Sequence, residues 1–126
     1  MSNLQHYTKQ PASGGKPKQV VVLLHGYGSN GRDLISLAPY WKKSVPDAVF
    51  ISPDAPFPCE IGVANENMRQ WFSLAEYTLQ KLLEGAREAH PVLDEYLDSV
   101  LKEYGLKDEN LALVGFSQGT MMSLYT

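Results

Sequence analysis

The sequence holds a single cysteine, Cys59, and this scarcity excludes an internal disulfide bond and fits a reducing compartment. Long apolar runs are also missing, because no segment approaches the roughly 18 consecutive apolar residues of a membrane span. The opening residues, MSNLQH, have neither the basic start nor the apolar stretch of a signal peptide. We therefore expect a cytoplasmic protein without a transmembrane segment.

A strong excess of either charge is absent as well. The chain has 11 Lys and Arg against 14 Asp and Glu, which gives a formal net charge of -3, and the two signs are interspersed. Because the balance is mild, neither nucleic acid nor an anionic membrane is an expected partner. The 126 residues, 44% hydrophobic and 20% charged, suffice for one folded domain with its own core.

Apolar runs rich in β-branched residues predict the strands of this domain. They lie at residues 19–24 (QVVVLL), 48–52 (AVFIS) and 111–114 (LALV). These runs lack polar alternation, which is typical of strands covered on both faces. Helices are predicted at residues 33–38, 74–89 and 91–104, and a first edge strand at 4–9. The alternation of strand and helix favours the α/β class with a parallel sheet, which binds ligands beyond the carboxyl ends of its strands.

One motif follows the last apolar run directly. Residues 115–119 (GFSQG) fit the G-x-S-x-G nucleophile elbow, a tight strand-to-helix turn that exposes a serine hydroxyl. Gly115 and Gly119 leave room for the close backbone approach of this turn, and Ser117 is the candidate nucleophile. The amide of Gln118, the residue after the serine, is the expected first donor to the oxyanion that forms on attack.

A second glycine-rich turn, residues 25–31 (HGYGSNG), follows the first predicted strand. In the elbow-containing fold such a loop supplies the second oxyanion donor, for which the Tyr27 amide is the best candidate. His25, Gly26 and Gly28 are then expected to support the turn.

A competing hypothesis uses the same turn. Gly26, Gly28 and Gly31 match the dinucleotide-binding pattern G-x-G-x-x-G, and Asp47 and Asp54 lie roughly 20 residues further on, although Asp54 follows a proline and is not at the strand tip, where a ribose would be bound. His25 intervenes between the strand and the first glycine, however, and this hypothesis leaves the 115–119 motif unexplained. A dinucleotide-binding module is therefore the less favoured alternative.

Three segments together resemble the carboxylesterase/phospholipase family, which includes the acyl-protein thioesterases and has the α/β-hydrolase fold. They are residues 24–34 (LHGYGSNGRDL), 68–72 (MRQWF) and 114–119 (VGFSQG). The resemblance implies a mostly parallel sheet flanked by helices, in one incomplete domain that is truncated after the nucleophile elbow. Residues 1–18 would form its N-terminal strand and loop, and residues 19–126 its core.

The resemblance also implies a serine hydrolase of carboxylic esters or acyl thioesters, acting on a small ester, an acylated lipid or an acylated protein, with no metal and no organic cofactor. Ser117 would be the nucleophile, and the Tyr27 and Gln118 amides would form the oxyanion hole. The segment 57–72 would border an acyl-binding groove, with candidate contacts at Phe57, Ile61, Met68 and Trp71. Ser73 departs from the aspartate that family members often have at this position.

The sequence lacks the acid and the histidine that follow the serine in this fold, because only nine residues come after Ser117 and none can serve. His25 is expected to be structural, His6 to lie at the far edge of the sheet, and His90 to mark a solvated helix boundary. We therefore expect the triad's aspartate and histidine to come from outside this chain, and a catalytically silent fragment or interaction module stays an alternative.

The unpaired edge of strand 111–114 is expected to associate with a second copy or with the missing half.

Overall fold

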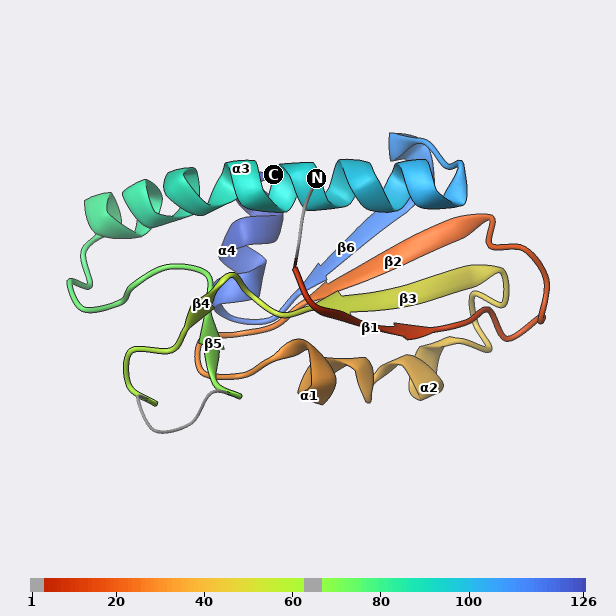
Figure 1. The fold of residues 1–126 in the computed structure, drawn as a ribbon, viewed down its shortest axis with the longest axis horizontal. Helices are drawn as coiled ribbons and strands as arrows, with labels where there is room; N and C mark the ends of the chain where they lie inside the picture. Colours follow the sequence, from red (N-terminus) through yellow and green to blue (C-terminus); the bar gives the residue numbers. More distant parts are fainter. Residues whose placement is uncertain (1–3, 63–66) are drawn as a thin grey trace.

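The computed structural model describes residues 4–62 and 67–126. In this part of the chain the main sheet has the strand order β1-β3-β2-β6 (Figure 1). Its strands are β1 (His6–Lys9), β2 (Gln19–Leu24), β3 (Ala48–Pro53) and β6 (Leu111–Gly115). Strand β2 is parallel to both β3 and β6, whereas β1 runs antiparallel to β3. The predicted strands are thus confirmed, and the three apolar ones, β2, β3 and β6, are parallel as expected.

Helices cover both faces of this sheet (Figure 1). One face carries α3 (Leu79–Tyr104) and α4 (Gln118–Tyr125), and the other carries α1 (Gly31–Ile35) and α2 (Ala38–Trp41). A 3-10 turn, η1 (Asp108–Asn110), leads into β6, and β4 (Phe57–Pro58) pairs antiparallel with β5 (Arg69–Gln70) in a small separate sheet. No helix among the described residues is long and apolar enough to cross a membrane.

The core divides into two layers because side chains alternate across a strand. On β2, Val20 and Val22 pack into the cluster beneath α3 and α4, while Leu23 packs toward α1 and α2. On β3, Ile51 joins the first cluster and Phe50 the second. All five side chains are buried, which explains why both strands are apolar without interruption.

Helix α3 differs from its prediction, since one continuous helix replaces the two expected segments. It begins at Leu79, where Thr78 Oγ1 accepts a hydrogen bond from the Lys81 amide, and it passes through Pro91. Proline removes one backbone hydrogen bond, but the helix buries apolar residues on both sides of it, from Ala86 to Leu101, against the sheet. Packing therefore holds the two halves together, and the helix ends as predicted at Gly105, which has a φ of 65°.

Strand β6 lies at one edge of the described sheet and pairs only with β2 among the described strands. Its residues are partly exposed, so the expectation that this strand is covered on both faces is wrong for this chain. The physical reason is that, within the described residues, β6 has a neighbouring strand on one side alone. The edge predicted to be unpaired is therefore present.

Candidate active site

The turn between β6 and α4 presents Ser117. Its backbone has a φ of 51° and a ψ of -115°, and no other non-glycine residue in the described part of the chain has a positive φ. Such a backbone conformation costs of order 1–3 kcal/mol and persists only where the surroundings hold it, which is typical of functional sites. The residue is exposed at the carboxyl end of its strand.

Two glycines let this turn pack tightly. A β-carbon at Gly115 would lie 2.6 Å from the Gly119 carbonyl oxygen, and one at Gly119 would lie 2.5 Å from the Leu24 carbonyl carbon and 2.7 Å from the His25 oxygen. The Phe116 amide also donates to the Leu24 oxygen, at 3.0 Å. The start of α4 therefore rests directly on the end of β2.

The loop after β2 lies against Ser117 as a result. A β-carbon at Gly26 would lie 3.2 Å from Ser117 Cβ and 3.8 Å from its Oγ. The amides further along this loop are occupied, because Gly28 donates to Arg69 O at 2.9 Å and Ser29 donates to Gly26 O at 3.1 Å.

Two backbone amides beside the serine remain available. Neither the Tyr27 amide nor the Gln118 amide donates to another of the described residues. Tyr27 follows Gly26, and Gln118 follows Ser117, so one free donor stands on each of the two turns. A pair of free amides flanking an exposed hydroxyl can receive the negative oxygen of a tetrahedral intermediate.

The Gln118 side chain binds the segment 68–72 to the turn that carries Ser117. Its Oε1 accepts from the Trp71 amide at 2.8 Å, and its Nε2 donates to Phe72 O at 2.9 Å. The Trp71 indole donates to His25 O at 2.9 Å. Gln118 and Trp71 are both buried, so these hydrogen bonds satisfy polar groups that would otherwise be costly to bury.

His25 has no free nitrogen. Its Nε2 accepts a hydrogen bond from the Ala55 amide at 2.9 Å, so the proton is on Nδ1, which donates to Gly26 O at 2.7 Å. Burial, the largest cause, lowers the pKa of His25 below its usual value. The neutral ring thus braces the loop after β2 and cannot take a proton from Ser117 in this arrangement.

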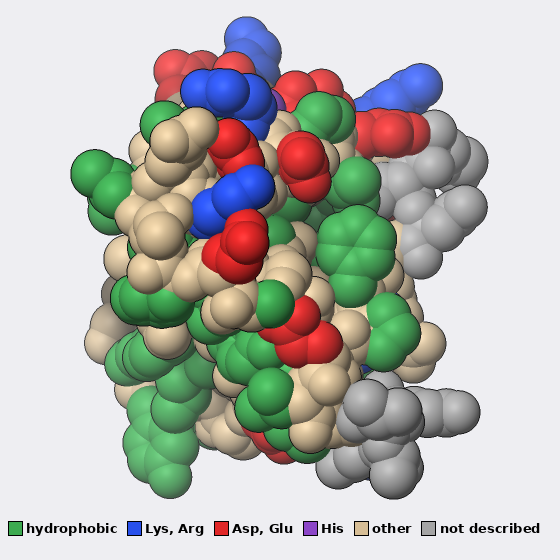
Figure 2. All heavy atoms as spheres, turned by 90° about the vertical axis from the view of Figure 1, so that its left-hand side faces the viewer, with side chains coloured by type: hydrophobic (Ala, Val, Ile, Leu, Met, Phe, Trp, Pro, Cys, Tyr) green, Lys and Arg blue, Asp and Glu red, His purple; other side chains and the backbone are tan. Residues whose placement is uncertain are grey.

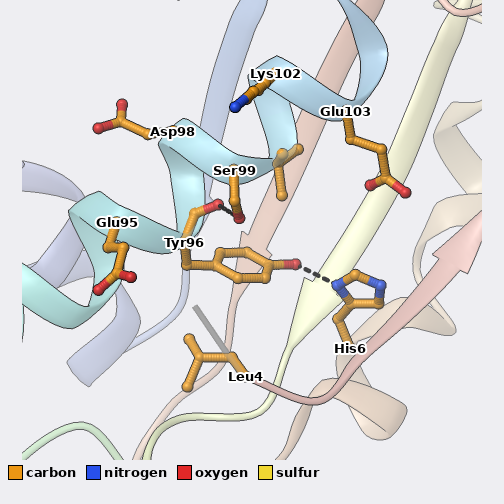
Figure 3. Close-up of a pocket in the computed structure, with 9 residues that line it drawn as sticks. Leu4, His6, Glu95, Tyr96, Asp98, Ser99, Lys102 and Glu103 are labelled. Atoms are coloured by element: carbon orange, nitrogen blue, oxygen red, sulfur yellow. Dashed lines mark hydrogen bonds between the residues drawn. The ribbon is translucent and has the colours of Figure 1, made fainter. Parts of the chain in front are cut away.

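The other two histidines are engaged elsewhere. His6 on β1, at the opposite edge of the sheet from β6 as predicted, bonds to the Tyr96 hydroxyl at 2.8 Å in a pocket of about 810 Å³ between β1 and α3 (Figure 3). His90 lies inside α3, stacks edge-on with Tyr125 and meets Thr126 Oγ1 at 3.4 Å, so its predicted place at a helix boundary is wrong. No histidine within the described ranges bonds to the Ser117 hydroxyl.

The residues predicted to border an acyl groove separate into two groups. Phe57 and Ile61 are 49% and 69% exposed, and Met68 is half-buried, with its Cε 3.3 Å from where a Gly28 β-carbon would stand. The molecular face around the small β4–β5 sheet carries many apolar side chains (Figure 2). Trp71 is 0% exposed, so the expectation that it contacts substrate is corrected: it packs inside.

The geometry disfavours the dinucleotide hypothesis. The Gly31 amide, which would face a pyrophosphate, donates to Asp54 Oδ1 at 2.8 Å. The Asn30 side chain caps α1 by accepting from the Asp33 amide at 2.8 Å. One of the donors and one of the acids that this hypothesis needs therefore bind each other.

Sequence reasoning missed Glu60. Its carboxylate accepts hydrogen bonds from the Tyr27 hydroxyl, from Ser73 Oγ and from the Leu74 amide. No motif contains this residue, and the one signal that pointed to the place was the serine at position 73, where the resemblance led us to expect an aspartate.

A mostly parallel sheet with helices on both faces, and a serine on a strained turn after one of its strands, define the α/β-hydrolase fold. Residues 8–126 match the phospholipase/carboxylesterase family. The chain belongs to this family.

Individual relatives agree with this assignment. Acyl-protein thioesterase 1 of Emericella nidulans is 30% identical over 122 residues, which cover 88% of this chain and 51% of that protein. Esterase YpfH of Escherichia coli is 30% identical over 125 residues, which cover 94% of this chain and 49% of that protein. The crystal structure of esterase PE8 superposes with a TM-score of 0.87 at 45% identity, covering 98% of this chain and 56% of the other. The chain spans about half the length of the curated relatives it matches.

Proposed function

We propose that this chain carries the nucleophile and the oxyanion hole of a serine hydrolase that cleaves carboxylic esters or acyl thioesters. The observation that carries the proposal is the exposed Ser117 on its strained turn, flanked by the free amides of Tyr27 and Gln118. His25, Gly26, Gly28, Gly115 and Gly119 support these two turns. The names of the relatives, an esterase and an acyl-protein thioesterase, favour this substrate class.

The chemistry follows from these positions. Ser117 Oγ attacks the acyl carbon, its proton passes to a base, and the carbonyl oxygen becomes an anion held by the two amides. Collapse of this intermediate expels the alcohol or thiol, which takes the proton, and leaves the acyl group on Ser117. Water then attacks the acyl-enzyme and releases the carboxylic acid. Each amide donor is worth about 2.7–4 kcal/mol in the transition state.

The base and its orienting acid are proposed to come from residues outside this chain. His25 is fully occupied, and His6 and His90 bond to other groups. Phe57, Ile61 and Met68 are proposed to contact the acyl group from the surface beside the loop after β2. A cytoplasmic location stays a prediction.

Turnover of p-nitrophenyl esters and of an acyl thioester tests this proposal. We expect residues 1–126 alone to be slower by about 10⁴-fold or more than the same residues joined to a segment that supplies the base and acid, as for removal of a triad member. Full activity of residues 1–126 alone would refute the external base. No turnover in either form would instead favour the alternative of a silent interaction module.

The edge of β6 is proposed to bind a second copy of the chain or the segment that supplies the base. An apolar edge with unpaired backbone groups favours pairing with another chain. We expect light scattering on residues 1–126 to show a molar mass above 14.0 kDa that rises with concentration. Ala112→Lys, which places a charge on an exposed position of β6, is expected to reduce this association. A monomer across the whole concentration range contradicts the idea.

A further inference from the structure

Glu60 gathers three hydrogen bonds on one carboxylate. The Tyr27 hydroxyl donates to Oε2 at 2.5 Å, the Leu74 amide donates to the same oxygen at 2.8 Å, and Ser73 Oγ donates to Oε1 at 2.6 Å. The Glu60 backbone is fixed as well, because its amide donates to Gln70 Oε1 at 2.9 Å. An exposed side chain is thereby held by partners from two separate segments, the loop after β2 and residues 73–74.

The charge of Glu60 suits this task. The hydrogen bonds from Ser73, Tyr27 and the Leu74 amide lower the pKa of Glu60 below its usual value, so the group is ionised at neutral pH. Partial burial, together with the hydrogen bond to Glu60, raises the pKa of Tyr27, so the phenol keeps the proton that it donates. An ionised carboxylate has enough lone pairs for all three donors, and its hydrogen bonds are about twice as strong as neutral ones.

We propose that Glu60 is a positioning residue that holds the oxyanion loop in place through the Tyr27 side chain. This inference rests on the proposed function, because it assigns the Tyr27 amide to the oxyanion. The loop is anchored after Tyr27 by the Gly28 and Ser29 amides, and Glu60 anchors the side chain of Tyr27 itself. A donor displaced by a fraction of an ångström loses much of its effect on the transition state.

The serine at position 73 fits the same arrangement. The resemblance led us to expect an aspartate there, whereas this chain has a serine whose hydroxyl donates to the Glu60 carboxylate. An aspartate at position 73 would set two carboxylates against each other. Ser73→Asp is therefore expected to disturb the loop, and Glu60→Gln added to it is expected to relieve the repulsion, because the glutamine amide can donate to the new carboxylate.

The test compares Glu60→Ala, Tyr27→Phe and the double variant in the catalytically competent protein, with Glu109→Ala as an exposed glutamate control. We expect kcat for a p-nitrophenyl ester to fall about tenfold in Glu60→Ala with KM unchanged, as for a misplaced oxyanion donor. Tyr27→Phe should add nothing to Glu60→Ala, since both remove the same contact. Ser73→Asp should lose activity, and Ser73→Asp with Glu60→Gln should regain it.

Any of three results overturns the proposal. They are an unchanged kcat in Glu60→Ala, additive effects of Glu60→Ala and Tyr27→Phe, and no recovery of activity when Glu60→Gln is added to Ser73→Asp. Hydrogen exchange of the Gly28 and Ser29 amides separates it from the proposed function. If the unaltered protein hydrolyses no ester, the proposed function fails, and the role of Glu60 in holding the loop is judged by hydrogen exchange alone. Faster exchange of the Gly28 and Ser29 amides in Glu60→Ala than in Glu109→Ala then supports that role, and equal exchange rejects it.

Discussion

Replacing Ser117 by alanine is expected to lower kcat for ester hydrolysis by at least about 10⁴-fold in the catalytically competent protein, because loss of the proposed nucleophile would remove the acyl-enzyme route. The two amides beside Ser117 would remain, so weak substrate binding should persist with little change in KM. Steady-state hydrolysis of p-nitrophenyl esters measures both constants. Ser123→Ala is the matched control, since Ser123 lies on the same helix and its hydroxyl bonds to Gly119 O.

The backbone of Ser117 allows a second comparison. Alanine keeps the strained φ of 51°, whereas glycine adopts positive φ readily. Ser117→Gly is therefore expected to raise the free energy of unfolding by about 1 kcal/mol relative to Ser117→Ala, while both variants lose activity. Urea denaturation measures the difference. Equal stabilities, or activity retained in either variant, would contradict the assignment of Ser117 as a nucleophile on a strained turn.

Gly119→Ala is expected to lower the free energy of unfolding by about 4 kcal/mol or more, which would remove much of a typical domain's stability. The added β-carbon would lie 2.5 Å from the Leu24 carbonyl carbon and 2.7 Å from the His25 oxygen. These are backbone atoms at the buried end of β2, so no side-chain rotation can relieve the contact. Helix α4 must shift or the elbow must open, and the alignment of the Gln118 amide is lost with it.

Circular dichroism and urea denaturation check this expectation, with Gly15→Ala as the control. A β-carbon at Gly15 would have Ser13 Oγ, at 3.7 Å, as its nearest contact, and the residue has no positive φ. Alanine there should leave stability unchanged or raise it by about 0.4–1 kcal/mol. If Gly119→Ala is as stable as Gly15→Ala, the packing of the elbow on β2 is not as described.

Local patterns of the sequence predicted the strands and the two turns because those features depend on nearby residues. Unbroken apolar runs such as 19–24 can be satisfied only by burial on both faces, and glycines at 115 and 119 indicate close backbone approach. The continuity of α3 through Pro91 escaped prediction. There the cost of the proline is local, whereas the compensating contacts are with a sheet formed from distant segments.

The sequence by itself determined the α/β architecture, the family and the candidate nucleophile, since each rests on residue types at fixed short spacing. Only the tertiary structure decided that Trp71 is internal, that both nitrogens of His25 are occupied, and that Glu60 holds Tyr27. Most of these contacts join partners far apart in the chain, as with the Gln118 side chain and the Trp71 amide, 47 residues away. A hydrogen bond over such a separation leaves no periodic trace in the sequence, because any chain path that brings the two groups together satisfies it.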